Sequence, residues 1–487
     1  MSIKRRDFVK ATVAAPLFLS GTSFLTRNVY AQSSTKKKIL FVYVPTGTTP
    51  KFWGTSRSSG ALSDAHFGSI ATNAGLNTLK EHLIMFNGVS HYQPKTGEPP
   101  RDHYEFYAPS GTIPYEYGRF AGMSHVLAGA GGYKKTTSIS DLGKRELESI
   151  DQFFKKKSKG SLDAKTIEAG YCTRIAAMGI NSNLIYHKNS ESKWTSRSCP
   201  DQPDYTPDWR IEILASHLKR SYEKIKSASP QEAKFFASHQ DTLKNLGITS
   251  NSRSQTAAAT CAPFSFPPTL PKGWQHIKGE NRKLVASANK HSVIEGFACH
   301  AMEMGVLQYG CAHNDFYFDH EYADSSRVYA NHHSESHARS AGFEDTHKCI
   351  LKDVIDIATA FKEKKSGSRT LLDEVLIFVT SDLGEFSDQH NGVNIPCFLL
   401  GGDKDLLNHG QFIDLTGAEV STHGGLAAKA RGSYNQLLTS LCHYMGYTDV
   451  DHYGIKKEFL GTFKDGSVKG VIEGVFKKNP SSSPNWG

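Results

Sequence analysis

Ile39-Leu40-Phe41-Val42-Tyr43-Val44 is the stretch that decides the fold. A continuous apolar run of this kind predicts a strand that is buried on both faces, because a half-exposed strand would alternate apolar and polar residues. Pro45-Thr46-Gly47 ends the run. Strands covered on both faces are typical of α/β proteins, in which helices pack on either side of a mostly parallel sheet.

Further segments along the chain extend this α/β pattern. Three more apolar runs predict strands of the same sheet, at Leu83–Phe86, Val375–Thr380 and Pro396–Leu400. Amphipathic periodicity predicts helices at roughly 76–82, 207–246, 282–308, 344–364 and 433–446. Residues 248–274 are rich in Ser, Thr, Ala and Pro, as in a linker or a long surface loop. We expect residues 32–487 to form a single α/β domain with a helical or loop insertion around 200–275.

The first 31 residues have the order of a secretory signal peptide. A basic head containing Arg5-Arg6 precedes a weakly apolar stretch, and Val29-Tyr30-Ala31 supplies small residues for cleavage. The paired arginines indicate the twin-arginine route, whose cargo crosses the membrane already folded. The apolar stretch of about 15 residues is shorter than the about 20 that a membrane span needs. We therefore expect the twin-arginine translocase as a partner, a periplasmic or secreted mature protein, and no stable membrane span.

Composition and charge exclude several other classes of protein. The formal net charge is +9, but five positive charges and one negative charge lie in the leader. The lysine runs Lys36–Lys38 and Lys155–Lys157 are short and far apart, which favours solvated surface over nucleic-acid binding. None of the eight cysteines forms a Cys-x-x-Cys pair, which disfavours thioredoxin-like and zinc-ribbon sites. In an oxidising compartment we expect one or two disulfides.

Polar residues follow the predicted strands directly, where α/β proteins gather their ligand-binding groups. They are Thr46, Thr48 and Thr49, then Ser90 and His91, then Ser381, Asp382, Glu385 and His390. Hydroxyls, carboxylates and imidazoles of this kind suit a hydrolytic or metal site. No Gly-x-Ser-x-Gly motif is present, which disfavours an ordinary serine hydrolase.

Histidines and acidic residues are unusually dense between His291 and His347. His333 and His337 are four residues apart, so on a helix they would share a face, as paired imidazole ligands do. We expect Asp382 and His390 to approach His333 or His337 at the carboxyl edge of the sheet. One carboxylate with two or three imidazoles would suit zinc or a similar divalent ion. The alternative is that Asp382 caps a turn and His390 is solvated.

Several short motifs occur in an order that resembles a bacterial family. After the leader they are Val44–Gly47, Trp53, Asn87–Val89, a histidine at 103 or 125, Ser149–Gln152, His332–His337, Thr370–Asp373, His390, Asn394–Gly402 and Asn435–Leu438. In this order the chain resembles the domain-of-unknown-function family fifteen-fifty-two, which is grouped with the alkaline-phosphatase-like superfamily. The resemblance implies an alkaline-phosphatase-like α/β fold and a relation to metal-dependent phosphatases and sulfatases.

The chain also departs from the working enzymes of that superfamily. The first strand ends in Val44-Pro45-Thr46, without the Asp that normally binds metal there, and no Cys/Ser-x-Pro-x-Arg signature is present. Two functions therefore stay open at this point. The first is a metal-dependent hydrolase of phosphate- or sulfate-like esters. The second is a non-catalytic periplasmic binding or accessory protein on a decayed hydrolase scaffold.

Overall fold

The computed structural model describes the part of the chain that positions the sheet and its edges. The described residues are 37–90, 92–94, 100–102, 126–127, 148–162, 166–171, 174–175, 180–181, 186–188, 194–196, 279–298, 302–310, 332–366, 369–385, 394–416, 419–421, 427–429, 432–454 and 469–478. The internal contacts separate Met1–Lys37 from a compact unit, Lys38–Gly487. All the elements below belong to the second unit.

Eight strands form the main sheet, and most of the helices pack against it. The strands are β1 (Lys38–Val44), β2 (Gly60–Ala61), β3 (Leu83–Asn87), β7 (Thr166–Tyr171), β12 (Met304–Tyr309), β15 (Val375–Ser381), β16 (Phe398–Gly401) and β17 (Gln411–Asp414). The α-helices are α3 (Ser69–Ala74), α7 (Ile150–Lys157), α11 (Gly279–Ala298), α12 (His332–Ala338), α13 (Ala341–Glu363) and α14 (Tyr434–Tyr444). The 3-10 helices are η1 (Pro50–Phe52), η2 (Asp64–His66), η3 (Leu76–His82) and η7 (Leu371–Asp373).

Short two-stranded sheets complete the described part of the chain. They are β4 (Val89–Ser90) with β20 (Gly432–Ser433), β5 (Tyr92–Pro94) with β6 (Pro100–Asp102), β8 (Arg174–Ile175) with β9 (Ile180–Asn181), β10 (Tyr186–Lys188) with β11 (Trp194–Ser196), β13 (Lys365–Ser366) with β14 (Arg369–Thr370), and β18 (Glu419–Ser421) with β19 (Ala427–Lys429).

The main sheet is mixed but mostly parallel. Its strand order is β2-β17-β3-β16-β15-β1-β12-β7. The strand β1 pairs in parallel with both β12 and β15, whereas β16 runs antiparallel to β15 and β3 and β2 runs antiparallel to β17. The carboxyl ends of β1, β15, β3 and β17 therefore meet at one edge, and β16 begins at that same edge.

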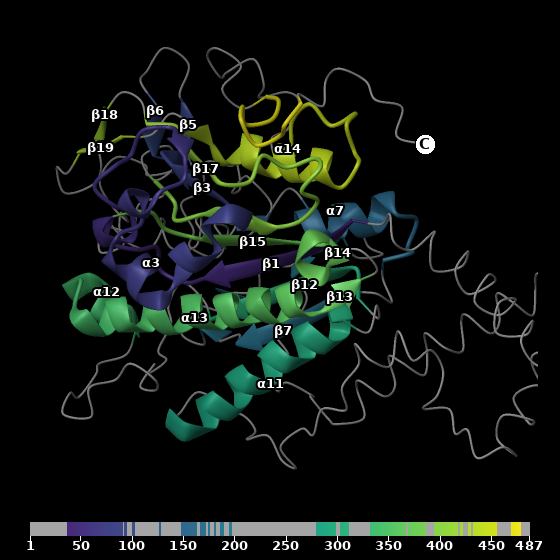
Figure 1. Cartoon of the computed structure of the whole chain (residues 1–487), viewed down its shortest axis with the longest axis horizontal. Coiled ribbons are helices and arrows are strands. Elements are labelled where there is room, and N and C mark those ends of the chain that lie inside the picture. Colours follow the sequence, from purple (N-terminus) through teal and green to yellow (C-terminus); the bar gives the residue numbers. More distant parts are fainter. Residues whose placement is uncertain are drawn as a thin grey trace, which may run out of the picture. The chain divides into compact units, whose positions relative to one another are not determined.

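Both faces of β1 are buried, as its apolar run predicts. Leu40, Val42 and Val44 belong to the core that includes residues of α3, α11 and α13. Ile39, Phe41 and Tyr43 belong to the core that includes residues of α7 and α14. Figure 1 shows α14 on one side of β15 and β1, with α13 and α11 on the other. The predicted α/β architecture, a mostly parallel sheet with helices on both faces, is confirmed.

Most of the predicted elements on the described residues are present. All four predicted strands occur in the main sheet, as β1, β3, β15 and β16. The helices expected at 344–364 and 433–446 correspond to α13 and α14. The predicted 207–246 helix and the insertion around 200–275 lie outside the described residues.

The single helix predicted over 282–308 is wrong in its second half. The helix α11 ends at Ala298, and Met304–Tyr309 is β12, a fully buried strand between β1 and β7. A short apolar run fits a buried helix and a buried strand equally well by periodicity. Pairing with β1 over Ile39–Tyr43 decides the outcome here.

Two lysines that the sequence assigned to solvated surface are buried. Lys38 is only 3% exposed and its Nζ lies 2.7 Å from Glu374 Oε2, at the amino ends of β1 and β15. Lys155 in α7 is 7% exposed. A lysine stem covers apolar surface readily, so a charged residue in a short basic run need not be solvated along its length.

Candidate functional site at the carboxyl edge

The turn after β1 holds two successive residues in the left-handed region. Thr46 has φ +71° and Gly47 has φ +66°. Gly47 is required there, because a Cβ would lie 2.5 Å from the carbonyl oxygen of Gly384. A threonine in this conformation costs about 1–3 kcal/mol and persists only where surrounding contacts hold it. Such strain at the end of a central strand marks a candidate site.

Three N–H groups of this turn donate hydrogen bonds to β15 and to the residues after it. The Thr46 N–H donates to Asp382 Oδ1 over 2.7 Å, and the Gly47 N–H donates to Ser381 Oγ over 2.8 Å. The Thr48 N–H donates to the Gly384 carbonyl over 3.0 Å. The parallel pairing of β1 with β15 places these groups side by side, so the strained turn follows from the sheet register.

Asp382 is the central residue of this edge. It is fully buried, and its Oδ1 accepts from the Thr46 N–H, whereas no donor in the described part of the chain reaches Oδ2 with hydrogen-bond geometry. Burial raises the pKa of Asp382 to about 6, although the Thr46 N–H and the Tyr43 hydroxyl oppose the rise. A buried carboxylate oxygen without a donor is costly unless it serves a ligand, an ion or a reaction.

A buried histidine reaches the same turn from α12. His332 is 1% exposed, and its Nδ1 lies 3.5 Å from Thr46 Oγ1. Its ring stacks on Phe343 with centroids 5.2 Å apart. Thr46 therefore contacts the Asp382 carboxylate through its N–H and the His332 imidazole through its hydroxyl.

A second buried histidine, His347, lies behind the first. The two imidazole centroids are 5.9 Å apart, and the His347 ring makes an edge contact with Phe343 at 4.5 Å. Burial lowers the pKa of His347 to about 3, and no group in the described segments forms a hydrogen bond with its Nε2. His347 is therefore a neutral imidazole over the whole physiological pH range.

Of the four predicted metal ligands, the structure describes the side chains of two. Asp382 lies at the sheet edge, where the sequence placed it, and His337 is exposed on α12. His333 belongs to α12, but its side chain lies outside the described part of the structure, and so does all of His390. Among the described residues no group of three or more His, Cys, Asp or Glu side chains is arranged to hold a metal. The predicted ligand set remains a prediction.

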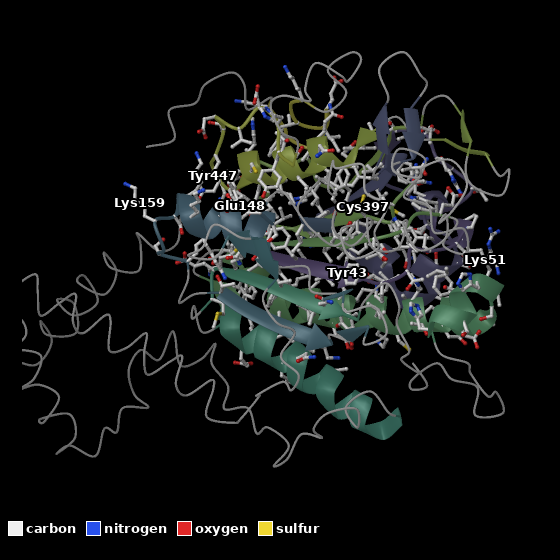
Figure 2. All side chains as sticks on the ribbon, turned by 180° about the vertical axis from the view of Figure 1, so that it is seen from behind. Tyr43, Lys51, Glu148, Lys159, Cys397 and Tyr447 are labelled. Atoms are coloured by element: carbon white, nitrogen blue, oxygen red, sulfur yellow. The ribbon has the colours of Figure 1, made fainter. Side chains whose placement is uncertain are left out.

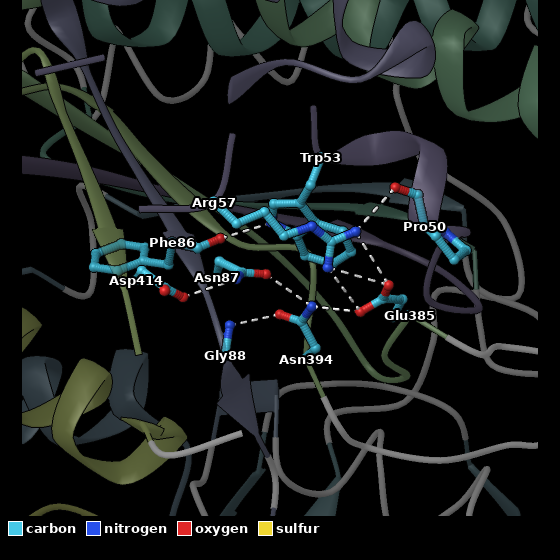
Figure 3. A network of polar contacts seen from close by, with 9 residues as sticks. All are labelled: Pro50, Trp53, Arg57, Phe86, Asn87, Gly88, Glu385, Asn394 and Asp414. Atoms are coloured by element: carbon cyan, nitrogen blue, oxygen red, sulfur yellow. Dashed lines mark hydrogen bonds and ion pairs between the residues drawn. The ribbon is translucent and has the colours of Figure 1, made fainter. Parts of the chain in front are cut away.

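Beyond Asp382 in the chain, a network of buried and half-buried amides and carboxylates ties four segments together (Figure 3). The Asn394 Nδ2 donates to Glu385 Oε2 over 2.6 Å and to Asn87 Oδ1 over 3.0 Å. The Asn394 Oδ1 accepts from the Gly88 N–H over 2.7 Å. Asn87 donates in turn to Asp414 Oδ1 over 2.8 Å. This network fixes the ends of β15, β3 and β17 against the start of β16.

Arg57 lies at one end of this network. Its guanidinium contacts Glu385 at 3.3–3.5 Å and the Pro50 carbonyl at 3.5 Å. It also lies over the Trp53 ring at 5.5 Å, and the indole Nε1 donates to the Phe86 carbonyl over 2.9 Å. The side chain of Arg57 is 34% exposed, whereas that of Glu385 is 10% exposed. The sequence analysis named Asn87 and Asn394 only as motif positions of the family resemblance and did not select Arg57, because nothing local in the sequence links these three residues.

The described cysteines do not take part in this site. Cys349, Cys397 and Cys442 are free and buried, and Figure 2 shows Cys397 inside the mass of side chains around the sheet. Burial raises the pKa of both Cys397 and Cys442 far above the ordinary thiol value, so both are unreactive thiols. The other five cysteines lie outside the described residues, so the expected disulfides stay a prediction.

Comparison with known proteins gives distant structural matches only. No family model matches the chain, and no curated protein matches it. The PsFucS1 sulfatase from Pseudoalteromonas sp. is 11% identical with a TM-score of 0.32, over 87% of this chain and 70% of that one. The lipoteichoic acid synthase LtaP from Listeria monocytogenes is 9% identical with a TM-score of 0.34, over 90% of this chain and 77% of that one.

A third match is the phosphonate monoester hydrolase of Agrobacterium radiobacter, 10% identical with a TM-score of 0.33, over 84% of this chain and 74% of that one. Likenesses at this level carry no activity over to this chain. The resemblance to family fifteen-fifty-two stays a prediction, since no family model supports it. No helix among the described residues is both long and apolar enough to cross a membrane.

Proposed function

We propose that this chain is an exported, metal-assisted hydrolase that acts on phosphate- or sulfate-like esters. The observation that carries the proposal is the Asp382 carboxylate. It is fully buried at the carboxyl edge of the sheet, it is fixed through Oδ1 by the N–H of a strained threonine, and its Oδ2 receives no hydrogen bond from the described residues. Unsatisfied buried groups and backbone strain of this kind concentrate at functional sites.

The donor types at this edge fit a borderline divalent ion such as zinc. Zinc takes carboxylate oxygens and imidazole nitrogens, and Asp382 and His332 approach Thr46 from two different elements. The residues that would hold the ion are Asp382 and imidazoles of the histidine-rich segment, with His333, His337 and His390 as the sequence-predicted set. Such an ion, when bound, activates water and neutralises charge on an ester oxygen.

The chain's own groups supply positioning and a protonation state. The Thr46 N–H holds Asp382 Oδ1 and leaves Oδ2 available. Since burial raises the pKa of Asp382 to about 6, the carboxylate is ionised above that pH and neutral below it. A ligand or general base at this position must be ionised, and a bound cation would favour that ionised form. The buried hydroxyls of Thr48 and Thr49 have no hydrogen-bond partner among the described residues and can bind ester oxygens.

The Asp382→Asn variant tests the site. It keeps an oxygen for the Thr46 N–H but removes the anionic ligand, so bound metal should fall from about one equivalent to a small fraction. Hydrolysis of p-nitrophenyl phosphate or sulfate should fall by at least about 100-fold, the upper range for loss of a supporting group at a metal site. Metal content would be measured by mass spectrometry on protein purified from the periplasm.

Asp373→Asn is the matched control, because Asp373 lies at the opposite end of β15, where it accepts from the N–H and hydroxyl of Thr370. It should retain both metal and activity. If the wild-type protein carries no metal and hydrolyses neither ester, the proposal is wrong. The non-catalytic periplasmic binding protein would then be the better description.

Export by the twin-arginine route is tested separately. Replacing Arg5 and Arg6 together with lysine should leave the unprocessed precursor in the cytoplasm, because the route reads the arginine pair and not the charge alone. Fractionation and immunoblotting measure the precursor and the mature form. Lys10→Arg, which keeps the pair and the charge, should be exported normally. Normal processing of the double-lysine variant would refute this route.

A further inference from the structure

We propose that Arg57 recognises the anionic group of the ligand, so that the site takes a molecule with phosphate- or sulfate-like oxygens. This inference rests on the proposed function, because it names the binding residue of that same site. Figure 3 shows the arrangement that motivates it, with the guanidinium placed between Trp53, Glu385 and the Pro50 carbonyl.

The orientation of Arg57 is fixed by its neighbours. Glu385 holds one side of the guanidinium, the Pro50 carbonyl holds a terminal nitrogen, and the Trp53 ring lies 5.5 Å from the guanidinium carbon. Trp53 is itself 3% exposed and hydrogen-bonded to the Phe86 carbonyl. Glu385 is anchored by Asn394 at 2.6 Å. An arginine held in this way loses little side-chain freedom when it binds an anion.

These neighbours leave donors of the guanidinium unused. Arginine has five N–H groups, and its hydrogen bonds with the described residues come only from the two terminal nitrogens. The contacts with Glu385 are 3.3–3.5 Å long, whereas a tight charge-assisted bond is about 2.7–2.9 Å. With its side chain 34% exposed, Arg57 can present its remaining N–H groups to a second set of oxygens.

Glu385 and Pro50, which contact Arg57, connect this arginine to the Asp382 site. Glu385 follows Asp382 by three residues, so their Cα atoms are at most about 10 Å apart. Pro50 follows the buried hydroxyls of Thr48 and Thr49 directly. The carboxylates of Asp382, Glu385 and Asp414 lie along this edge and would repel an anion, and Lys51 of η1 is already paired with Glu344 at 2.6 Å. Arg57 therefore makes anion binding at this edge electrostatically feasible.

Arg369 shows what an arginine of similar exposure looks like in a purely structural ion pair. Its side chain is 37% exposed and pairs with Asp403 at 3.3 Å and with Asp405, near the amino end of β15. Two carboxylates neutralise Arg369, whereas one carboxylate, one carbonyl and one ring surround Arg57. Arg369 is therefore the matched control for loss of a partly exposed arginine.

The experiment measures binding of inorganic phosphate and inorganic sulfate to the full mature chain by titration calorimetry. Arg57→Ala should lower the affinity for whichever of the two anions binds by about 10- to 100-fold, the loss expected for hydrogen bonds to a charged group. Arg57→Lys keeps the charge but not the planar guanidinium, so its anion affinity should lie between those of the wild type and Arg57→Ala. Glu385→Gln should strengthen binding, because it removes the competing carboxylate, and Arg369→Ala should match the wild type within about twofold.

The outcomes separate this inference from the proposed hydrolase. If no ester is hydrolysed but anion binding depends on Arg57, the inference stands and the hydrolase proposal fails. If esters are hydrolysed and Arg57→Lys and Arg57→Ala leave both KM and anion affinity unchanged, the inference fails and the hydrolase stands. Failure of the wild type to bind either anion also overturns it. Should Arg57→Ala misfold by circular dichroism, Arg57→Lys and Glu385→Gln carry the test.

Discussion

Replacing His347 with leucine is expected to remove this histidine's own destabilising contribution, which reaches about 3 kcal/mol at pH 4.5. Burial lowers the pKa of His347 from 6.5 to about 3, so the folded protein keeps this imidazole neutral while the unfolded chain protonates it. Stability from this group is therefore intact above pH 6.5 and is lost steadily as the pH falls toward 3. Each pH unit in that window costs about 1.4 kcal/mol.

The measurement is the free energy of unfolding in urea, from pH 8 to pH 4, for both proteins. Phe343→Leu is the control, because Phe343 packs against the same imidazole at 4.5 Å without titrating. It should lower stability by a similar amount at every pH and leave the acid slope unchanged. A His347→Leu protein with the wild-type acid slope would show that another group causes the acid sensitivity.

Asp382→Asn is expected to stabilise the metal-free protein by about 1–3 kcal/mol at pH 8. Burial raises the pKa of Asp382 from 3.8 to about 6, and a shift of about two units corresponds to about 3 kcal/mol against the ionised form. This group's contribution to stability is present below the ordinary carboxyl pKa and is lost as the pH rises through about 6. Asparagine has no such loss, although its unpaired N–H groups take back part of the gain.

Unfolding in the presence of a chelator measures this effect, and the gain should vanish below about pH 4. Asp373→Asn should behave in the opposite way. Partial burial raises the pKa of Asp373. The N–H and hydroxyl of Thr370 outweigh burial and bring that pKa below its ordinary value. Its contribution is thus present at neutral pH and lost in acid, so Asp373→Asn should destabilise at pH 8. An Asp382→Asn protein less stable than wild type at pH 8 would contradict the cost assigned to the buried carboxylate.

The two titrations also act against each other in the wild type. Between pH 6 and pH 4, protonation of Asp382 favours folding while the neutral state of His347 disfavours it. The wild-type profile should therefore be flatter in that range than the profile of either Asp382→Asn or His347→Leu. Comparison of the three proteins reveals contributions that the wild type alone would conceal.

The strands were predictable where burial alone determines the sequence. Lys38–Val44 and Val375–Ser381 lie in the middle of the sheet, so both of their faces select apolar residues and the run is continuous. Met304–Tyr309 is buried in the same way, but most of it was assigned to the preceding helix, because a short apolar run fits a buried helix and a buried strand equally well. For short buried segments of this kind, pairing with neighbouring strands decides whether a strand or a helix forms.

The position of a site residue was predictable only where that residue directly follows a strand. Asp382 follows a buried strand directly, and this placed it at the edge correctly. His333 and His337 were chosen as ligands because of their spacing of four residues, and His332 was not, yet among the described imidazoles it is His332 that contacts Thr46. The pairing of Arg57 with Glu385 joins residues far apart in the chain, and a single sequence holds no local trace of such a contact.

The pairing of β1 has a consequence for the timing of biosynthesis. Ile39 pairs with Met304 on one side and with Leu376 on the other, so the first strand cannot complete its ladder until most of the chain has been made. At about 5–20 residues per second, this leaves β1 without its partners for on the order of tens of seconds. Contacts of such long sequence separation also slow folding itself. If the leader addresses a translocase that accepts folded cargo, the nascent chain needs protection of its N-terminal apolar segment during that interval, and a chaperone that binds this segment would set the pace of export.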